Sequence, residues 1–288
     1  MNYSQLKSQV KSTGIGKLLL RIRNKLNDTG LHPDIKPEKK MSLEEFTGIF
    51  NKLGVLRGDC VVVHHSSGNL GLEFNPVTLI ELLQEAVGPE GNIIMLAEPF
   101  RGRSLNYLKD SPTFNLDEPC KLGIISEIFR RSEDVYRTVN PVSSVCIWGK
   151  NAKELSRQHK SLEFAFGEDS VYGYCNKVNA KVLGLGVDVV TLSPIHYFET
   201  LLKDRFPIYT GDKYKVELID ENEKKLIEIH ALTPHTLRNW KQIAKAVENE
   251  PGSQRFIAHD RVFYSTSFSS IGKIINELIG KNKFFKNI

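Results

Sequence analysis

The stretch CVVVHHSSGNLGLEFNPVTLIELLQEAVGPEGNIIML, residues 60–96, decides the fold class of this chain. Residues 60–64 are a short β-branched run typical of a buried strand, and small polar residues follow it at 65–69. A helix is predicted over 75–87, because Asn-Pro opens this segment and Gly-Pro follows it. Residues 92–96 predict a second buried strand. A strand, a small-residue loop, a helix, a tight turn and another strand indicate an α/β fold.

The alternation of helices and strands continues on both sides of this stretch. Upstream, Ser42 and Glu45 have the spacing of a capping box and predict the start of a helix that Gly54 ends. Downstream, the pattern predicts strands over 145–148 and 181–186, helices over 122–133, 152–159, 193–204 and 269–279, and an irregular segment over 101–121. Residues 213–219 and 223–230 alternate polar and apolar side chains, which predicts a β-hairpin. We therefore expect a mixed α/β core that carries a hairpin insertion.

The first 41 residues differ in charge from the rest of the chain. Residues 1–40 hold nine Lys/Arg against three Asp/Glu, whereas the whole chain has a net charge of only +5. Residues 15–27 predict a short amphipathic helix and 28–41 a linker, so we divide the chain into an arm, 1–41, and an α/β domain, 42–288. The arm could pack on its own domain, on a second copy in a homo-oligomer, on an acidic partner or on an anionic membrane surface.

Composition excludes several classes of protein. The uneven charge is unlike that of a nucleic-acid-binding protein, which is basic throughout its binding domain. No run approaches the roughly 18 apolar residues of a membrane span, and no signal peptide is visible, so we expect a cytoplasmic protein. The four cysteines include no C-x-x-C pair, which argues for packed free thiols and against a metal centre. The chain also lacks a Walker A sequence and a G-x-S-x-G elbow.

Two groups of residues could carry chemistry. His64 ends a predicted strand, and the small residues after it could offer hydroxyls and backbone N–H groups to a phosphate or an oxyanion. The alternative is a polar loop with one buried, hydrogen-bonded histidine. His196 and Glu199 have i, i+3 spacing on a predicted helix, so the carboxylate could orient the imidazole as a general base. The alternative is a structural pair.

Arginines gather around residues 138–141. Arg130, Arg131 and Arg137 flank this segment and could pair with the phosphates of a ligand. The alternative is that they lie on a solvated helix face. The sequence alone leaves both interpretations open.

Taken in order, five segments resemble the aminoglycoside 3-N-acetyltransferase family, also called the antibiotic N-acetyltransferase family. These segments are VVVHHSSGNLG at 61–71, VGPEGNIIM at 87–95, LGIISEIFRR at 122–131, FGEDSVYG at 166–173 and VLGLGVDVVTLSPIHYFE at 182–199. They look like the family's V-H-x-S loop, its V-G-P-x-G-T turn and strand, the segment before R-S-x-H-P, the F-G-x-x-S-P stretch, and the L-G-x-G stretch that leads to T-x-x-H-x-x-E. The resemblance runs from about Ser42 to Leu202, and more loosely to about Ile279.

The resemblance implies a three-layer α/β/α fold unrelated to that of the GNAT acetyltransferases. It also implies direct acyl transfer from acetyl-CoA, or another acyl-CoA, to the amine of a sugar, without a metal. The residues it implies for catalysis are His196, Glu199, His64 and Asn140. Those it implies for coenzyme binding are His65, Ser66, Ser67, Gly68, Arg101 and Ser144, and those for acceptor binding are Arg130, Arg137, Glu168 and Ser170.

One departure from the family pattern concerns the base. The family's R-S-x-H-P reads Arg137-Thr138-Val139-Asn140-Pro141 here, and an asparagine cannot take a proton near neutral pH. Three explanations compete: His196 or His64 transfers the proton, the acceptor differs and Asn140 holds one of its hydroxyls, or the chain is a catalytically inactive scaffold that binds CoA or sugar. We favour the first two together.

The acceptor is expected to follow the charge of the site loops. Because these loops carry Arg101, Arg103, Arg130, Arg131 and Arg137, we expect an anionic acceptor. A nucleotide-linked amino sugar used in surface-polysaccharide synthesis would fit. The alternative is an aminoglycoside antibiotic, for which a site rich in acidic residues would be more usual.

Overall fold

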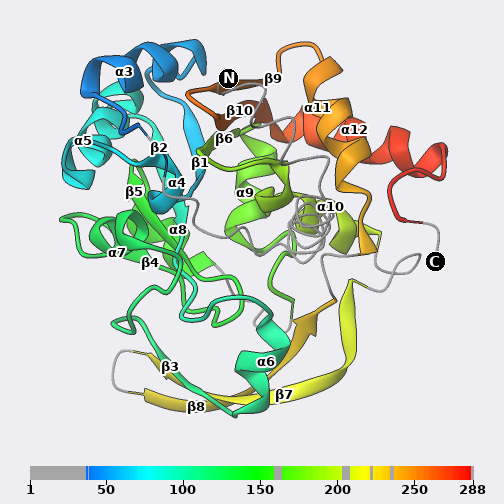
Figure 1. Ribbon diagram of the computed structural model, residues 1–288. Helices are drawn as coiled ribbons and strands as arrows, with labels where there is room; N and C mark the ends of the chain where they lie inside the picture. Colours follow the sequence, from blue (N-terminus) through cyan, green and yellow to red (C-terminus); the bar gives the residue numbers. More distant parts are fainter. Residues whose placement is uncertain are drawn as a thin grey trace, which may run out of the picture.

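The fold of this chain is a three-layer α/β/α core with a second, smaller sheet attached, as seen in a computed structural model (Figure 1). The structure describes residues 37, 39–158, 164–202, 208–220, 223–233 and 237–286. The main sheet has seven strands in the order β4-β5-β2-β1-β6-β10-β9. In Figure 1 helices lie on both sides of it, which confirms the predicted fold class.

The centre of the main sheet is parallel and its flanks are antiparallel. β1 (Cys60–His65) lies between β2 (Asn92–Leu96) and β6 (Lys181–Leu185), and all three run in the same direction. β5 (Val145–Gly149) and β10 (Arg261–Ser267) pair antiparallel to β2 and β6, and β4 (Tyr136–Arg137) and β9 (Gln254–Ala258) form the edges. The three parallel strands are buried on both faces, which explains their nearly continuous apolar sequences.

One face of the sheet is covered by helices from the first half of the chain. They are α3 (Leu43–Lys52), the single turn α4 (Ser67–Leu70), α5 (Pro76–Val87) and α7 (Ile124–Arg130). The predicted capping box is present, because Ser42 accepts a hydrogen bond from the Glu45 N–H and Glu45 accepts one from the Ser42 N–H. Phe46, Leu83 and Phe129 pack there against alternate residues of the strands.

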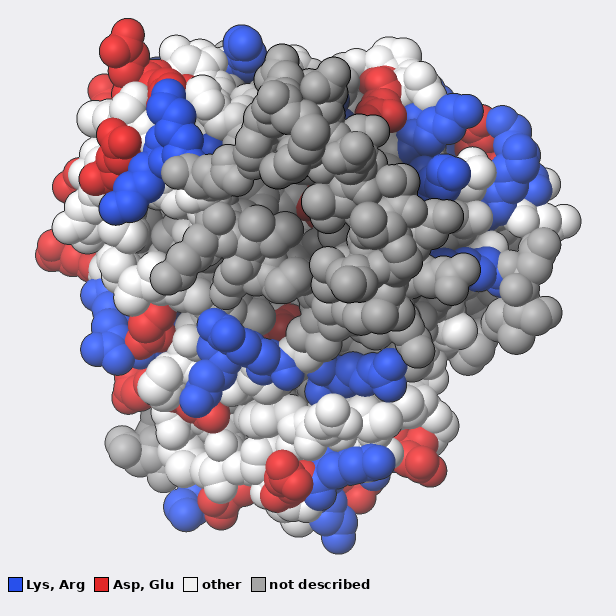
Figure 2. Space-filling model, in the orientation of Figure 1, with Lys and Arg blue, Asp and Glu red and all other residues white. Residues whose placement is uncertain are grey.

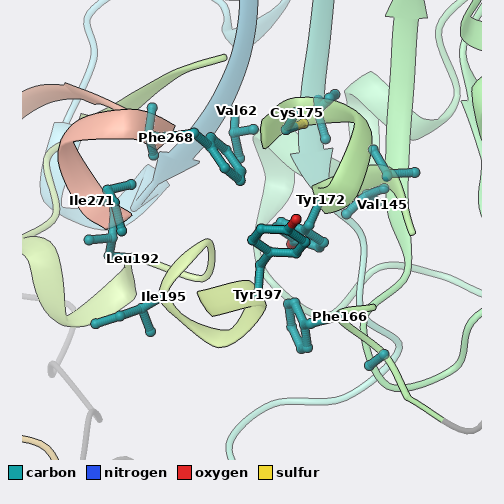
Figure 3. Close-up of a cluster of buried hydrophobic side chains, with 14 of the residues drawn as sticks. Val62, Val145, Phe166, Tyr172, Cys175, Leu192, Ile195, Tyr197, Phe268 and Ile271 are labelled. Carbon is teal, nitrogen blue, oxygen red and sulfur yellow. The ribbon is translucent and has the colours of Figure 1, made fainter. Parts of the chain in front are cut away.

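The opposite face carries helices from the second half. They are α8 (Ala152–Gln158), α9 (Val171–Lys177), α10 (Ile195–Leu201), α11 (Trp240–Asn249) and α12 (Phe268–Gly280), with the 3-10 turn η1 (Val189–Thr191). Tyr172, Tyr197 and Phe268 form part of the core on this side, with Val62 of β1 and Val145 of β5 (Figure 3). The two faces thus have separate cores, and alternate residues of each strand belong to one core or the other.

The predicted hairpin is confirmed and longer than expected. β7 (Tyr209–Asp220) pairs antiparallel with β8 (Glu223–Leu232), and β3 (Thr113–Asn115) adds a parallel third strand. The prediction of an irregular segment over 101–121 was therefore wrong, because it contains β3 and α6 (Ser104–Lys109). Both elements are short, and they are stabilised by contact with the hairpin rather than by a pattern of their own.

Three elements near the C-terminus were not predicted. α11, β9 and β10 precede the helix expected over 269–279, which is α12. β10 has the sequence RVFYSTS and pairs antiparallel with β6, second from one edge of the sheet. Gly184 of β6 pairs with Tyr264 of β10. Glycine is required at this position because a Cβ would lie 1.9 Å from a carbon of the Tyr264 ring.

The predicted arm lies almost entirely outside the described residues, as do its amphipathic helix and its proposed contacts. Within the described ranges, no helix combines the length and apolarity needed to cross a membrane. On the face drawn in Figure 2, Lys/Arg and Asp/Glu side chains of the described surface are interspersed.

Candidate active site

The residues predicted to carry chemistry lie where the three parallel strands end. His64 and His65 are the last residues of β1, and they project to opposite faces of the sheet because successive side chains of a strand alternate. His64 therefore faces the core that contains Tyr172, and His65 faces the core under α7. The structure thus separates two histidines that are adjacent in the sequence.

His64 lies in a buried hydrogen-bonded chain. Its Nε2 lies 2.8 Å from the Ser193 hydroxyl, which lies 3.2 Å from the Tyr172 hydroxyl. Its Nδ1 lies 3.4 Å from the Tyr264 hydroxyl. Burial lowers the pKa of His64 to about 3, and the charge of the neighbouring His65 adds to this effect. A hydrogen bond with the Leu183 backbone acts in the opposite direction and raises the pKa. The imidazole is therefore neutral near pH 7.

His65 and the small-residue loop occupy the other face. The His65 Nε2 lies 2.8 Å from the Ser126 hydroxyl, while its buried Nδ1 has no hydrogen-bond partner among the described residues. Burial lowers the pKa of His65 to about 4. Ser66 caps α4 by accepting from the Asn69 N–H, and Gly68 lies within that turn. The Ser67 hydroxyl accepts a hydrogen bond from the Ile125 N–H, so this loop contacts the start of α7.

His196, Glu199 and Arg238 form a buried charged group on α10. The His196 Nδ1 lies 2.7 Å from the Glu199 Oε2, as the i, i+3 spacing predicts. Arg238 binds the same carboxylate through Nε to Oε1 and through Nη2 to Oε2 at 2.7 Å. The side chains of Arg238 and Glu199 are only 1% and 2% exposed.

The electrostatics of this group keep Glu199 charged and His196 neutral. Burial lowers the pKa of His196 and outweighs the opposing effect of the Glu199 carboxylate. For Glu199, burial raises the pKa, but the His196 and Arg238 contacts outweigh it and the net shift is downward. A neutral imidazole that donates its Nδ1 proton to Glu199 carries its basic lone pair on Nε2.

Asn140 is buried in the loop between β4 and β5. Its Oδ1 accepts hydrogen bonds from the Val142 and Ser143 N–H groups at 2.9 and 3.0 Å. Its Nδ2 has no partner among the described residues, although the residue is 0% exposed. The side chain therefore holds the loop through its oxygen and leaves a buried N–H donor without a protein acceptor.

Contacts between loops bring Asn140 and His196 to the same end of the sheet. The Ser143 hydroxyl donates to the Ala165 carbonyl at 3.0 Å. The ring of the next residue, Phe166, lies 5.1 Å from the His196 ring and 4.7 Å from the Tyr172 ring, measured between centroids. Phe166 and Tyr172 also lie side by side in Figure 3. The Asn140 loop, α9 and α10 thus converge around Phe166.

The arginines predicted to bind phosphate have protein partners. Arg130 binds both carboxylate oxygens of Glu127, at 2.9 and 3.0 Å, and Arg131 binds the same carboxylate at 2.6 Å. Buried Arg137 donates to the Ala97, Leu116 and Glu118 carbonyls and to the Ser144 hydroxyl. Arg101 is exposed and donates its Nε to the Lys121 carbonyl at 2.7 Å. All three arginines predicted around residues 138–141 therefore have carboxylate or carbonyl partners.

The remaining predicted residues lie in the same region with different exposures. The Ser144 hydroxyl donates to the Ala97 carbonyl at 2.8 Å, beside the end of β2. Ser170 caps α9 by accepting from the Tyr172 and Gly173 N–H groups. Glu168 is exposed just before that cap. Among the described side chains, no three His, Cys, Asp or Glu residues are arranged to hold a metal ion.

Glu98 is a residue of this region that the sequence interpretation missed. It lies two residues beyond β2 and is half-buried. Burial raises the pKa of its carboxyl to about 8. The signal in the sequence was an acidic residue directly after a buried strand, the position at which ligands bind in α/β sheets.

This chain is similar in sequence to known proteins. Residues 62–276 match the family model described as aminoglycoside 3-N-acetyltransferase. Aminoglycoside N(3)-acetyltransferase III of Pseudomonas aeruginosa is 23% identical over 224 residues, which cover 72% of this chain and 81% of that protein. The aminoglycoside N(3')-acetyltransferase-like protein YokD of Bacillus subtilis is 29% identical over 181 residues, 57% of this chain and 65% of that protein.

Solved structures share the fold. The crystal structure of YokD superposes with a TM-score of 0.70 at 22% identity, covering 88% of this chain and 97% of that one. The structure of AAC-IIIb in a binary complex with CoASH also gives a TM-score of 0.70, at 18% identity, covering 87% of this chain and 100% of that one.

Proposed function

The chain belongs to the aminoglycoside 3-N-acetyltransferase family of acetyl-CoA-dependent acyltransferases, and on that premise we propose that it acetylates an amino group of an aminoglycoside by direct transfer. The observation that carries the proposal is the match of residues 62–276, which begins within β1, ends within α12 and includes the other six strands of the main sheet. Aminoglycoside N(3)-acetyltransferase III of Pseudomonas aeruginosa, which matches 72% of this chain, is named for the same reaction.

His196 is the residue to which we assign proton transfer during acyl transfer. An attacking amine must lose a proton as its C–N bond forms, and the departing CoA thiolate must gain one. A neutral imidazole oriented by an ionised carboxylate can take the first proton and deliver it to the sulfur. His196 has this form, because Glu199 and Arg238 hold its tautomer and burial keeps it neutral.

Asn140 and the loop after β1 are assigned binding roles. The unpartnered Asn140 Nδ2 can donate a hydrogen bond to a hydroxyl of the acceptor. Residues 65–68, Arg101 and Ser144 remain our proposal for contacts with CoA, supported by their position near the strand ends. CoA is a molecule that AAC-IIIb binds.

The charges of the site region support an aminoglycoside more than a nucleotide-linked sugar. The expectation of an anionic acceptor rested on five arginines. Three of them, Arg130, Arg131 and Arg137, are engaged by Glu127 or by backbone carbonyls, whereas Arg101 and Arg103 are exposed. A half-buried carboxyl, Glu98, lies at the same strand ends. A carboxylate can form a charge-assisted hydrogen bond with an ammonium group.

The experiment that tests the proposal measures CoA thiol release by the full-length protein. Gentamicin and kanamycin are compared with UDP- and dTDP-linked amino sugars as acceptors. Turnover on the antibiotics supports the proposal, and turnover on nucleotide sugars alone replaces the acceptor class. Binding of acetyl-CoA without turnover on any of these acceptors would favour the scaffold alternative.

Two variants test the assigned roles. His196→Ala should lower kcat by about 10²–10⁴-fold if this imidazole transfers the proton. The matched control is His259→Asn, at a histidine in the turn between β9 and β10, which should leave kcat unchanged. Asn140→His adds a base on the loop, and a gain in rate would indicate that proton transfer limits the wild-type enzyme.

A further inference from the structure

The proton balance of the proposed reaction includes a second proton, for which no protein group has yet been assigned. An acceptor amine is an ammonium ion near neutral pH, and the product is a neutral amide, so the nitrogen loses two protons. The thiolate of CoA takes one of them to become a thiol. The other must leave for the solvent, and it must leave first, because an ammonium has no lone pair with which to attack the thioester.

The residues assigned so far do not supply this step. His196 is 3% exposed, and its proton is needed by the sulfur. Asn140 is an amide and takes no proton near pH 7. His64 is engaged at both ring nitrogens, by Ser193 and by Tyr264.

Glu98 has the position that the step requires. The antiparallel pairing of β2 with β5 continues past the strand, since the Ala97 N–H donates to the Ser144 carbonyl at 2.8 Å. The alternation along β2 then places residue 98 on the same face as Ile94, whose side chain belongs to the core with Tyr172 and Phe166. The side chain of Ala97 belongs, with that of Met95, to the core on the opposite face of the sheet.

The surroundings of Glu98 suit a proton acceptor. Glu98 is a half-buried residue, so part of it remains exposed to solvent. The Glu98 charge acts on two titratable groups of this region, because it contributes, after burial, to the raised pKa of the Tyr172 hydroxyl on α9 and of the Cys120 thiol. The guanidinium of Arg137, which binds the carbonyl of the preceding residue Ala97, is engaged with that oxygen and three others.

This environment also sets when the carboxyl is charged. Burial raises the pKa of Glu98 to about 8, so the free enzyme holds the carboxyl largely protonated at pH 7. A neighbouring ammonium stabilises the carboxylate and lowers its pKa. A carboxyl whose pKa falls between those of an ordinary glutamate and an amine is well matched to exchange a proton with an ammonium.

We propose that Glu98 is the base that takes the first proton from the acceptor ammonium and passes it to solvent. The N–H bond of the ammonium breaks, an O–H bond forms on Glu98, and the nitrogen keeps the electron pair with which it attacks the thioester. The acquired proton then leaves to water. This inference rests on the proposed function and adds a catalytic residue to it.

The test compares kcat on gentamicin for the full-length wild type, Glu98→Gln, Glu98→Ala and a control. The control is Glu90→Gln, an exposed acid just before the same strand, which pairs with Lys150. We expect Glu98→Gln to lower kcat at least 100-fold and Glu90→Gln to leave it unchanged. Added formate should raise the rate of Glu98→Ala at least tenfold, because a free carboxylate can occupy the space and accept the proton.

A second measurement reports on the carboxyl itself. The infrared band of the protonated Glu98 carboxyl, obtained as the difference between wild type and Glu98→Gln, should disappear with a midpoint above pH 7. A loss below tenfold for Glu98→Gln, no rescue of Glu98→Ala by formate, or a midpoint below pH 6 would each overturn the assignment while the wild type remains active. Absence of wild-type turnover would overturn the proposed function and this inference together.

Discussion

The buried pair of Arg238 and Glu199 yields the sharpest stability prediction. Replacing Arg238 with Met keeps an apolar side chain of similar length but leaves the Glu199 carboxylate, 2% exposed, without its cation. Removing one partner of a buried pair typically costs about 3–5 kcal/mol of unfolding free energy, because an uncompensated charge remains out of water. At about 2–4 °C per kcal/mol for a chain of this size class, Tm should fall by about 6–20 °C.

The assay is urea denaturation at pH 7 and again at pH 5. Without Arg238 the pKa of Glu199 rises, so the carboxyl protonates more readily and the deficit of the variant should shrink at the lower pH. Lys281→Met is the control, since Lys281 and Glu277 form an ion pair on an exposed helix face and its loss should change the free energy of unfolding very little. A cost for Arg238→Met no larger than that of the control would refute the reasoning.

Three further predictions concern stability. Burial lowers the pKa values of His64 and His65 to about 3 and about 4, so below pH 6.5 the unfolded chain binds more protons than the folded chain. Each of these two histidines should therefore lower the free energy of unfolding by about 2 kcal/mol at pH 5. His65→Gln should remove about half of this loss in urea titrations, and an unchanged pH dependence would contradict it. Gly184→Ala should destabilise by about 1–3 kcal/mol because its Cβ meets the Tyr264 ring, and thermal unfolding should show much less effect in a Tyr264→Val background. Ser42→Ala should cost about 1 kcal/mol in the same assay through loss of the capping box, whereas Ser42→Asp should be nearly neutral; equal effects would refute the capping role.

Elements with a strong local pattern could be predicted from the sequence. The β-branched runs that form β1, β2 and β6, the capping box of α3 and the Asn-Pro start of α5 each carry their signal within a few residues. The i, i+3 contact between His196 and Glu199 is of the same kind, because helix geometry alone brings the two side chains together.

Other features depend on where distant segments meet. Arg238 lies 39 residues from Glu199, and no local pattern marks it as the cation that keeps this carboxylate charged. The sequence suggested that the arginines around residues 138–141 bind phosphate. In the structure they donate hydrogen bonds to Glu127 and to the carbonyls of residues 97, 116 and 118. β9, β10 and the short β3 are likewise stabilised by the strands beside them.

The sequence by itself therefore determined the fold class, the order of the central elements and the resemblance to the family, because these depend on hydrophobic periodicity and short motifs. Only the tertiary structure decided which side chains are free to meet a ligand. It bound the predicted phosphate-binding arginines to Glu127 and to backbone carbonyls, left the Asn140 Nδ2 without a described partner and partly buried the Glu98 carboxyl at the end of β2. The physical reason is that burial and pairing depend on segments that are remote in the chain, whereas periodicity depends on neighbours.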